Sequence, residues 1–156
     1  MKDSQCNLTI KKMEKDDINI LYDIALRTFQ PDYEKYGMYP PLINEKNKKF
    51  LPPLMFGKTI LLDGNIIGGA FVVGIGKKGE IGAIFIDPHY QHKGYGKEVM
   101  LMIERLYPKI KKWKLETPSE SLELHTFYES LGYIKTGEMK DKKSGMVGFI
   151  YEKIVQ

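Results

Sequence analysis

The residues with the clearest chemical potential form the segment Gln91-His92-Lys93-Gly94-Tyr95-Gly96-Lys97. It follows an apolar run ending in Ile84-Phe85-Ile86, and it precedes a stretch in which apolar residues recur at helical spacing. The first turn of a helix carries unpaired N–H groups and about half a positive charge, so such a junction attracts phosphate. Gly94 and Gly96 allow a ligand close to the backbone, and Lys93 and Lys97 add positive charge. The segment is therefore predicted to bind a phosphate or pyrophosphate.

The two glycines are also compatible with a purely structural role. A tight turn that enters a helix without any ligand has the same composition. The Walker pattern is absent, because no Gly-Lys-Ser/Thr follows the loop. The dinucleotide fingerprint needs a third glycine and an early strand of a βαβ array, whereas this loop follows antiparallel strands. Both nucleotide-loop interpretations therefore fit poorly.

The elements before the loop are predicted from periodicity and turn residues. Leu8 and Ile10 alternate with polar neighbours and indicate a strand, and Asp16 and Asp17 offer caps for a helix that ends near Phe29. The Pro- and Tyr-rich stretch 30–53 is irregular, with helical turns expected at 32–36 and 44–50. Three antiparallel strands are then expected at 58–62, 66–75 and 80–86, the first two joined by a hairpin at Asp63-Gly64-Asn65.

The elements after the loop complete an α+β fold. A helix should run from Gly94 to before Pro108, followed by a strand at 112–116 with Trp113 in the core. Thr117-Pro118-Ser119-Glu120 has the form of a capping box at the start of the next helix. That helix is expected to bury the stripe Leu124, Phe127, Tyr128 and Leu131, and strands at 133–139 and 146–154 should close the sheet. The prediction is a three-layer α/β/α fold with a mixed, mostly antiparallel sheet of about seven strands and about four helices.

The bulk composition predicts one domain over residues 1–156, with 42% hydrophobic and 28% charged residues. The net charge of +4 suits a polyanionic small ligand and also weak nucleic-acid binding. Cys6 is the only cysteine, which excludes a disulfide framework and fits a reducing compartment. Neither a signal peptide nor a membrane-length apolar run is present, so a cytoplasmic location is expected.

A family resemblance gives these features a common interpretation. Gln91-x-x-Gly94-x-Gly96, between a strand and a helix, resembles the phosphate-binding loop of the GNAT acetyltransferase superfamily. The approach Phe85-Ile86-Asp87-Pro88-x-Tyr90-Gln91 is typical of that family, and 127–133 (Phe-Tyr-Glu-Ser-Leu-Gly-Tyr) resembles its later helix end. The order of elements from Leu8 to Ile154 also matches, so the resemblance covers nearly the whole chain.

The resemblance implies that the chain binds acetyl-CoA, the acyl donor. The loop backbone from Gln91 to Gly96, including His92, Lys93 and Tyr95, would wrap the pyrophosphate, with Lys97 beside it. The strand end Ile84, Phe85 and Ile86 would pair with the pantetheine arm. The usual asparagine after the next strand falls on Ser121, a departure in which a hydroxyl would partly replace the amide.

The resemblance also implies an N-acetyltransferase that acts on a primary amine of a small molecule or peptide by direct attack in a ternary complex. Tyr128 matches the family's tyrosine near the sulfur and is the candidate acid, while a core tyrosine is its structural alternative. Glu80 is the candidate base, and an exposed glutamate at a strand start is the alternative. Tyr33, Tyr36, Met38 and Tyr39 are expected to line the acceptor pocket.

Two further functions are compatible with parts of the sequence. The main alternative is a non-catalytic acyl-CoA-binding or sensing domain of the same fold. Nucleic-acid binding by the basic run 109–114 is less favoured than a solvated strand edge. His89 and His92 lie three residues apart and His125 is distant, whereas a metal site usually has more ligands at defined spacing, so no metal is expected. His125 is expected to be exposed on its helix. No membrane partner is expected, while a homodimer is plausible because strand edges would be exposed.

Overall fold

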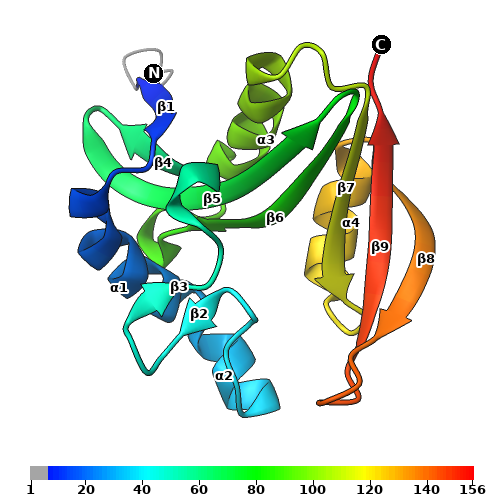
Figure 1. Ribbon diagram of the computed structural model, residues 1–156, viewed down its shortest axis with the longest axis horizontal. Helices are drawn as coiled ribbons and strands as arrows, with labels where there is room; N and C mark the ends of the chain where they lie inside the picture. Colours follow the sequence, from blue (N-terminus) through cyan, green and yellow to red (C-terminus); the bar gives the residue numbers. More distant parts are fainter. Residues whose placement is uncertain (1–6) are drawn as a thin grey trace. The chain divides into compact units, whose positions relative to one another are not determined.

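The computed structural model describes residues 7–156, so Cys6 and the polar residues before it lie outside the described part. Seven strands of the described chain form one mixed sheet, in the order β1-β4-β5-β6-β7-β9-β8, and the chain has four α-helices (Figure 1). This confirms the predicted sheet and helix content. The strands, in sheet order, are β1 (Leu8–Lys12), β4 (Gly57–Leu62), β5 (Asn65–Ile75), β6 (Lys78–Ile86), β7 (Lys112–Pro118), β9 (Val147–Ile154) and β8 (Ile134–Lys140). The helices are α1 (Ile18–Thr28), α2 (Gln30–Tyr36), α3 (Tyr95–Leu106) and α4 (Leu122–Ser130).

The chain divides into two compact units. The first contains the chain up to Val72 together with Ala83–Ile103, and the second contains Val73–Gly82 and Glu104–Gln156. Strands β5 and β6 and helix α3 therefore contribute residues to both units. The 91–97 segment belongs wholly to the first unit, and α4 belongs wholly to the second.

The first unit has its core between α1 and the sheet. The buried face of α1 presents Leu21, Ile24 and Ala25, which cluster with Phe71 of β5 and Phe85 of β6. The ring of Phe50 lies 5.3 Å from that of Phe71 and 5.7 Å from that of Phe85, centroid to centroid. The ring of Phe29, which directly follows α1, lies 6.2 Å from that of Phe85, so aromatic packing also joins α1 to the strand that leads into the candidate loop.

The β4–β5 hairpin forms as predicted. Asp63 and Gly64 have φ angles of 51° and 85°, the left-handed conformations that a tight two-residue hairpin turn requires. Leu62 pairs with Asn65 directly across the turn. This hairpin is followed by β6, so the antiparallel strands lead to the loop in the expected order.

The prediction of a helical turn at 44–50 is wrong. The segment forms a small hairpin, β2 (Ile43–Asn44) paired with β3 (Lys49–Phe50). Ile43 is buried, and its partner Phe50 reaches the aromatic core, so tertiary burial determines the local structure here. The turn at 32–36, in contrast, is confirmed as part of α2, which begins at Gln30 with Pro31 in its first turn.

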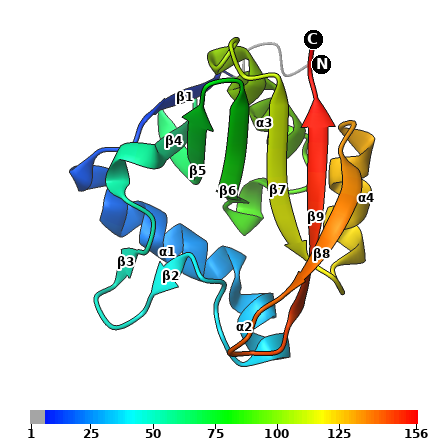
Figure 2. The ribbon, with the colours of Figure 1, turned by 45° about the vertical axis from the view of Figure 1, so that its right-hand side comes forward.

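The second unit is built on β7. It pairs with β9 along its whole length, from Lys112↔Ile154 to Pro118↔Gly148, and β9 pairs in turn with β8 (Figure 2). On its other edge β7 pairs with β6, in parallel as predicted, and Lys78–Glu80 lie opposite Lys112–Lys114. Trp113 is fully buried, as predicted, and a Cβ on Gly79 would lie 2.6 Å from its ring. A glycine at this position therefore makes room for the tryptophan.

The predicted capping box at 117–120 is wrong. Thr117 and Pro118 belong to β7, where they pair with Phe149 and Gly148, and α4 begins at Leu122 with Ser121 before it. The predicted buried stripe of α4 is confirmed at Tyr128 and Leu131, whereas Leu124 lies outside it. Leu124 is 36% exposed, whereas His125 is 8% exposed and Tyr128 is 7% exposed. The expectation that His125 is exposed is therefore also wrong.

No helix within residues 7–156 is long and apolar enough to cross a membrane.

Candidate functional site

The loop between β6 and α3 has the backbone conformation of an anion site. His92 and Gly94 have positive φ angles of 63° and 87°, and the Gly94 carbonyl accepts the first helical bond from Glu98 N–H. Within the described chain, the amides of His92, Lys93, Gly94 and Gly96 donate no hydrogen bond to a protein atom. Successive free amides in a left-handed turn at a helix N-terminus form a concavity that suits negatively charged oxygens. The structure thus places four of the predicted loop residues where their backbones can hold a phosphate.

Asp87 anchors the chain just before this loop. Its carboxylate accepts a bond from the His89 amide at 3.0 Å, and the Arg27 guanidinium lies 3.1 Å away. Burial acts to raise the pKa of Asp87, but the bonds from His89 and the charge of Arg27 outweigh it and hold the pKa below its usual value. Because Arg27 belongs to α1, this contact ties the helix to the end of β6.

We expect Asp87→Asn to destabilise the protein at neutral pH. A carboxylate whose pKa is lowered by folding contributes stability above its unfolded pKa of about 3.9, and this contribution is lost as the pH falls through the folded value. The difference in melting temperature between wild type and Asp87→Asn should thus be constant above about pH 5 and shrink below about pH 4. Thermal unfolding from pH 3 to 7 measures it.

Asp141→Asn serves as the control for this experiment, because Asp141 also has a lowered pKa but lies exposed in the β8–β9 turn. Asp141→Asn should lower the melting temperature less than Asp87→Asn does at every pH. A difference between Asp87→Asn and wild type that stayed unchanged down to pH 3 would contradict the assigned role.

The carbonyl oxygen of Ile86 receives two side-chain donors. Gln91 Nε2 donates to it at 2.8 Å, and Thr28 Oγ1 donates to it at 3.1 Å. The same threonine hydroxyl lies 2.8 Å from the Ile24 carbonyl of its own helix. The side chain of Gln91, the first residue of the signature, is therefore directed at the protein backbone.

The side chains at the end of β6 are buried in the first unit. The Phe85 side chain is 2% exposed in the core of the first unit, and Ile86 is also buried. A ligand could therefore meet these residues only through main-chain groups. Ile84 is half-buried.

Tyr128 lies in the second unit, on α4. Its ring makes edge-on contacts with Phe127 and Tyr133, with centroids 5.1 Å and 5.9 Å away. Burial raises the pKa of its hydroxyl to about 12. Because this pKa lies far above 7, the hydroxyl is protonated at neutral pH. It has no hydrogen bond partner among the described residues and is therefore free to donate.

The remaining second-unit residues are Ser121 and Glu80. The Ser121 side chain makes no capping bond, while its carbonyl accepts from the His125 amide at 3.1 Å. Glu80 is exposed on β6, in register with Lys114. Neither side chain makes a hydrogen bond or ion pair elsewhere in the described chain.

The predicted acceptor residues lie on and just after α2 in the first unit. The structure brings two of them together, because the rings of Tyr33 and Tyr39 are 4.6 Å apart and the Tyr39 hydroxyl donates to Gln30 at 3.1 Å. Tyr36 lies under the ammonium group of Lys35, and Met38 is 45% exposed. The segment therefore presents an aromatic, partly exposed surface.

Sequence reasoning missed three residues that shape these regions. Arg27 and Thr28 follow the helical pattern of α1 and carry no signal of their contacts with residues 86 and 87, which are distant in sequence. His125 stacks on Phe149 with centroids 4.9 Å apart, and its Nε2 lies 2.9 Å from the Pro118 carbonyl. The only sequence signal for His125 was its position as a polar residue next to the apolar residues of α4.

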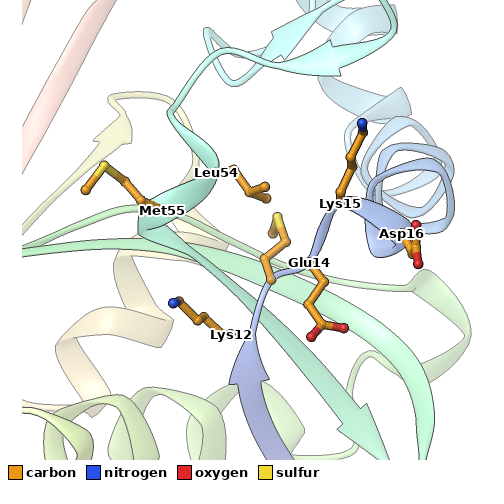
Figure 3. A pocket seen from close by; sticks show the side chains of 7 residues that line it. Lys12, Glu14, Lys15, Asp16, Leu54 and Met55 are labelled. Atoms are coloured by element: carbon orange, nitrogen blue, oxygen red, sulfur yellow. The ribbon is translucent and has the colours of Figure 1, made fainter.

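A hollow of about 640 Å³ lies elsewhere in the first unit (Figure 3). Lys12 and Glu14 reach it from the end of β1, and Leu54 and Met55 reach it from a 3-10 turn (Leu54–Phe56). None of the predicted site residues lines it. Among residues 7–156, no group of three or more His, Cys, Asp or Glu side chains is placed to hold a metal ion.

Solved structures of known proteins share this fold. PaiA N-acetyltransferase from Thermoplasma acidophilum, in complex with coenzyme A, aligns with a TM-score of 0.72 at 21% identity, over 96% of this chain and 99% of that one. The ribosomal-protein-S18-alanine N-acetyltransferase from Escherichia coli gives 0.69 at 16% identity, over 96% and 95%. A GNAT family acetyltransferase from Elizabethkingia anophelis with acetyl-CoA bound gives 0.67 at 16% identity, over 96% and 99%.

Sequence comparison identifies the family. The family model described as "Acetyltransferase (GNAT) family" matches residues 18–133, which include the loop and α4. The chain therefore belongs to the GNAT acetyltransferase family. Among proteins with curated descriptions, none matches the sequence.

Proposed function

We propose that this chain is an acetyl-CoA-dependent N-acetyltransferase, formed by one domain, that acetylates the primary amine of a small molecule or peptide. The observation that carries the proposal is the set of free amides of His92, Lys93, Gly94 and Gly96 at the N-terminus of α3, in a chain of the GNAT family. Solved relatives of the same fold hold coenzyme A or acetyl-CoA, which supports the choice of ligand.

The donor would be held mainly by backbone. The amides of His92, Lys93, Gly94 and Gly96 would meet the pyrophosphate, and Lys93 and Lys97 would add positive charge. Main-chain groups near Ile84 would pair with the pantetheine arm as an added strand does. When bound, acetyl-CoA supplies an activated acyl group as a thioester.

Tyr128 would act on the departing sulfur. A thiol has a pKa of about 8.5, well below the value of about 12 for Tyr128, so complete proton transfer to the thiolate would be unfavourable. A protonated hydroxyl can nevertheless stabilise developing negative charge by donating a hydrogen bond in a site with little water. Tyr128 is therefore proposed as a hydrogen bond donor to the leaving group, which refines its predicted role as an acid.

Glu80 would accept the proton that the acceptor amine must lose before or during attack. Its carboxylate is exposed and unpaired among the described residues, so a water molecule can lie between it and the amine. The amine itself would meet the aromatic surface of Tyr33 and Tyr39, with Tyr36 and Met38 beside it. Aromatic faces attract alkylammonium groups and also pack against apolar chains.

The proposal is tested with the purified protein and acetyl-CoA. A ligand that binds only the folded state stabilises it, by about 2.7 kcal/mol at a hundredfold excess over Kd, so the melting temperature should rise by several degrees. A panel of primary amines should then release free thiol. Absence of any melting shift would contradict the proposal, whereas binding without thiol release for any amine would favour a sensing domain.

We expect Tyr128→Phe to lower kcat roughly ten- to a hundredfold, while the Kd of acetyl-CoA changes little. The matched control is Tyr133→Phe, because Tyr133 also has a buried hydroxyl with a raised pKa, and that hydroxyl has no partner in the described chain. Removing an unsatisfied buried hydroxyl costs little, so kcat should be retained. Steady-state kinetics and calorimetry separate the two effects, and equal losses in both variants would remove Tyr128 from the mechanism.

A further inference from the structure

We propose that Gln91 and Thr28 are positioning residues, which hold the Ile86 carbonyl and thereby set the anion-binding loop in its binding conformation before a ligand arrives. The proposal rests on the proposed function only for the identity of that ligand. It gives the first residue of the loop signature a structural role in place of the predicted contact with the cofactor.

The two donors saturate one acceptor. A carbonyl oxygen has two lone pairs, and Gln91 Nε2 at 2.8 Å and Thr28 Oγ1 at 3.1 Å account for both. The threonine has one hydroxyl proton, which it divides between Ile86 and the nearer Ile24 carbonyl. The stronger and more specific of the two bonds to Ile86 is therefore that of Gln91.

The bond from Gln91 closes a ring around a short turn. The chain leaves β6 at Ile86, makes the 3-10 turn Pro88–Tyr90, and returns so that Gln91 reaches back five residues. Its main-chain amide also meets the Pro88 carbonyl, but at a long 3.3 Å. The side chain is thus the firmer of the two contacts that hold Gln91 in place.

The residues that follow need such an anchor. His92 adopts a φ of 63°, and an L-residue in the left-handed region costs about 1 kcal/mol or more. The free amides of His92, Lys93 and Gly94 provide no compensating bonds within the described protein. The last side-chain contact before this strained turn is the one from Gln91 to Ile86, so its loss should let the turn relax.

The same strand end is held from the other side by α1. Thr28 donates to residue 86 and Arg27 pairs with residue 87, so consecutive residues of α1 hold consecutive residues of the strand end. An occupied Ile86 carbonyl also leaves this group unavailable to the pantetheine arm, which must then use other main-chain groups.

The experiment uses the full chain and measures the loop without ligand. Gln91→Met keeps the side-chain length and removes the donor, and Gln91→Arg restores N–H donors. Backbone order parameters of His92–Gly94 should be near 0.85 in wild type, fall below about 0.6 in Gln91→Met, and recover in Gln91→Arg. Gln30→Met is the control, because it removes an amide that meets Tyr39, and it should leave these values unchanged.

Acetyl-CoA affinity provides the second measurement. Gln91→Met should weaken binding about tenfold and Thr28→Val two- to threefold, and the double variant should be no weaker than Gln91→Met, because both act through one carbonyl. The proposal would be overturned if the losses of acetyl-CoA affinity multiplied in the double variant. It would also be overturned if the loop stayed rigid in ligand-free Gln91→Met. The order parameters test it even if wild type fails to bind acetyl-CoA, so failure of the proposed function is distinguishable. If Gln91→Met does not fold, Gln91→Glu takes its place, because the glutamate side chain has the same shape as glutamine and lacks the N–H donor.

Discussion

Gly94→Ala should reduce acetyl-CoA affinity about five- to thirtyfold while leaving a folded protein. Gly94 has a φ of 87°, which an alanine adopts at a cost of about 1–2 kcal/mol. Nothing lies within 4 Å of the Cβ that alanine would add, so the substitution creates no clash inside the protein. Alanine would instead favour another conformation of the ligand-free loop, and the free energy needed to restore the binding conformation would weaken acetyl-CoA binding. A free energy of about 1.4 kcal/mol corresponds to a tenfold change in Kd. Calorimetric titration measures the loss.

The chain offers a close control for this substitution. Gly64, in the β4–β5 turn, has a φ of 85° and also has nothing within 4 Å of an added Cβ. Gly64→Ala should therefore lower the melting temperature at least as much as Gly94→Ala does, and only Gly94→Ala should affect acetyl-CoA binding. Equal affinity in both variants would show that the 91–97 loop is not the donor site.

Gly68→Ala should destabilise the fold more than any other substitution considered in this protein. An ideal Cβ on Gly68 would lie 2.1 Å from the Phe85 carbonyl oxygen and 3.1 Å from the Ile86 Cα. These are backbone atoms of β6, so neither can turn aside, and the two strands must separate. We expect a loss of at least about 3 kcal/mol in the free energy of unfolding, measured by denaturant titration, since overpacking a rigid site reaches this range.

Gly74→Ala on the same strand is the matched control. Its Cβ would lie 3.2 Å from the tip of the Ile110 side chain, which can rotate away. Its cost should therefore be within about 1 kcal/mol. Comparable stability of the two variants would contradict the close approach of β5 and β6 at Gly68. Because Gly68 faces the strand end that carries Ile86, a folded Gly68→Ala protein should also bind acetyl-CoA more weakly.

The fold was largely predictable where local chemistry and tertiary packing agree. Asp63-Gly64 specifies a tight turn by its own backbone preferences, and the structure contains it. At Thr117 and Pro118 the two disagree. The local pattern favours a helix start, but pairing of both residues with β9 extends the strand and delays the helix to Leu122. Sequence periodicity contains no information about such a distant partner.

The site was predictable to the extent that it is backbone. Glycine spacing before a helix predicts free amides, and the described structure has them at His92, Lys93, Gly94 and Gly96. The anchors could not be predicted, because Thr28 and Arg27 act on a strand end about sixty residues away. The roles of Tyr128 and Glu80 and those of the α2 tyrosines remain proposals, since they depend on a ligand and an acceptor.

The pairing of β1 has a consequence for the order in which the protein forms. Leu8 pairs with Leu62 and Lys12 with Lys58, so the first strand must wait for a partner made about fifty residues later. At a synthesis rate of about 5–20 residues per second, β1 spends several seconds without its partner. Within residues 7–156, strand β1 also lies at the edge of the sheet and pairs only with β4. It should therefore dock late, and slowing synthesis after codon 12 should leave the yield of folded protein nearly unchanged.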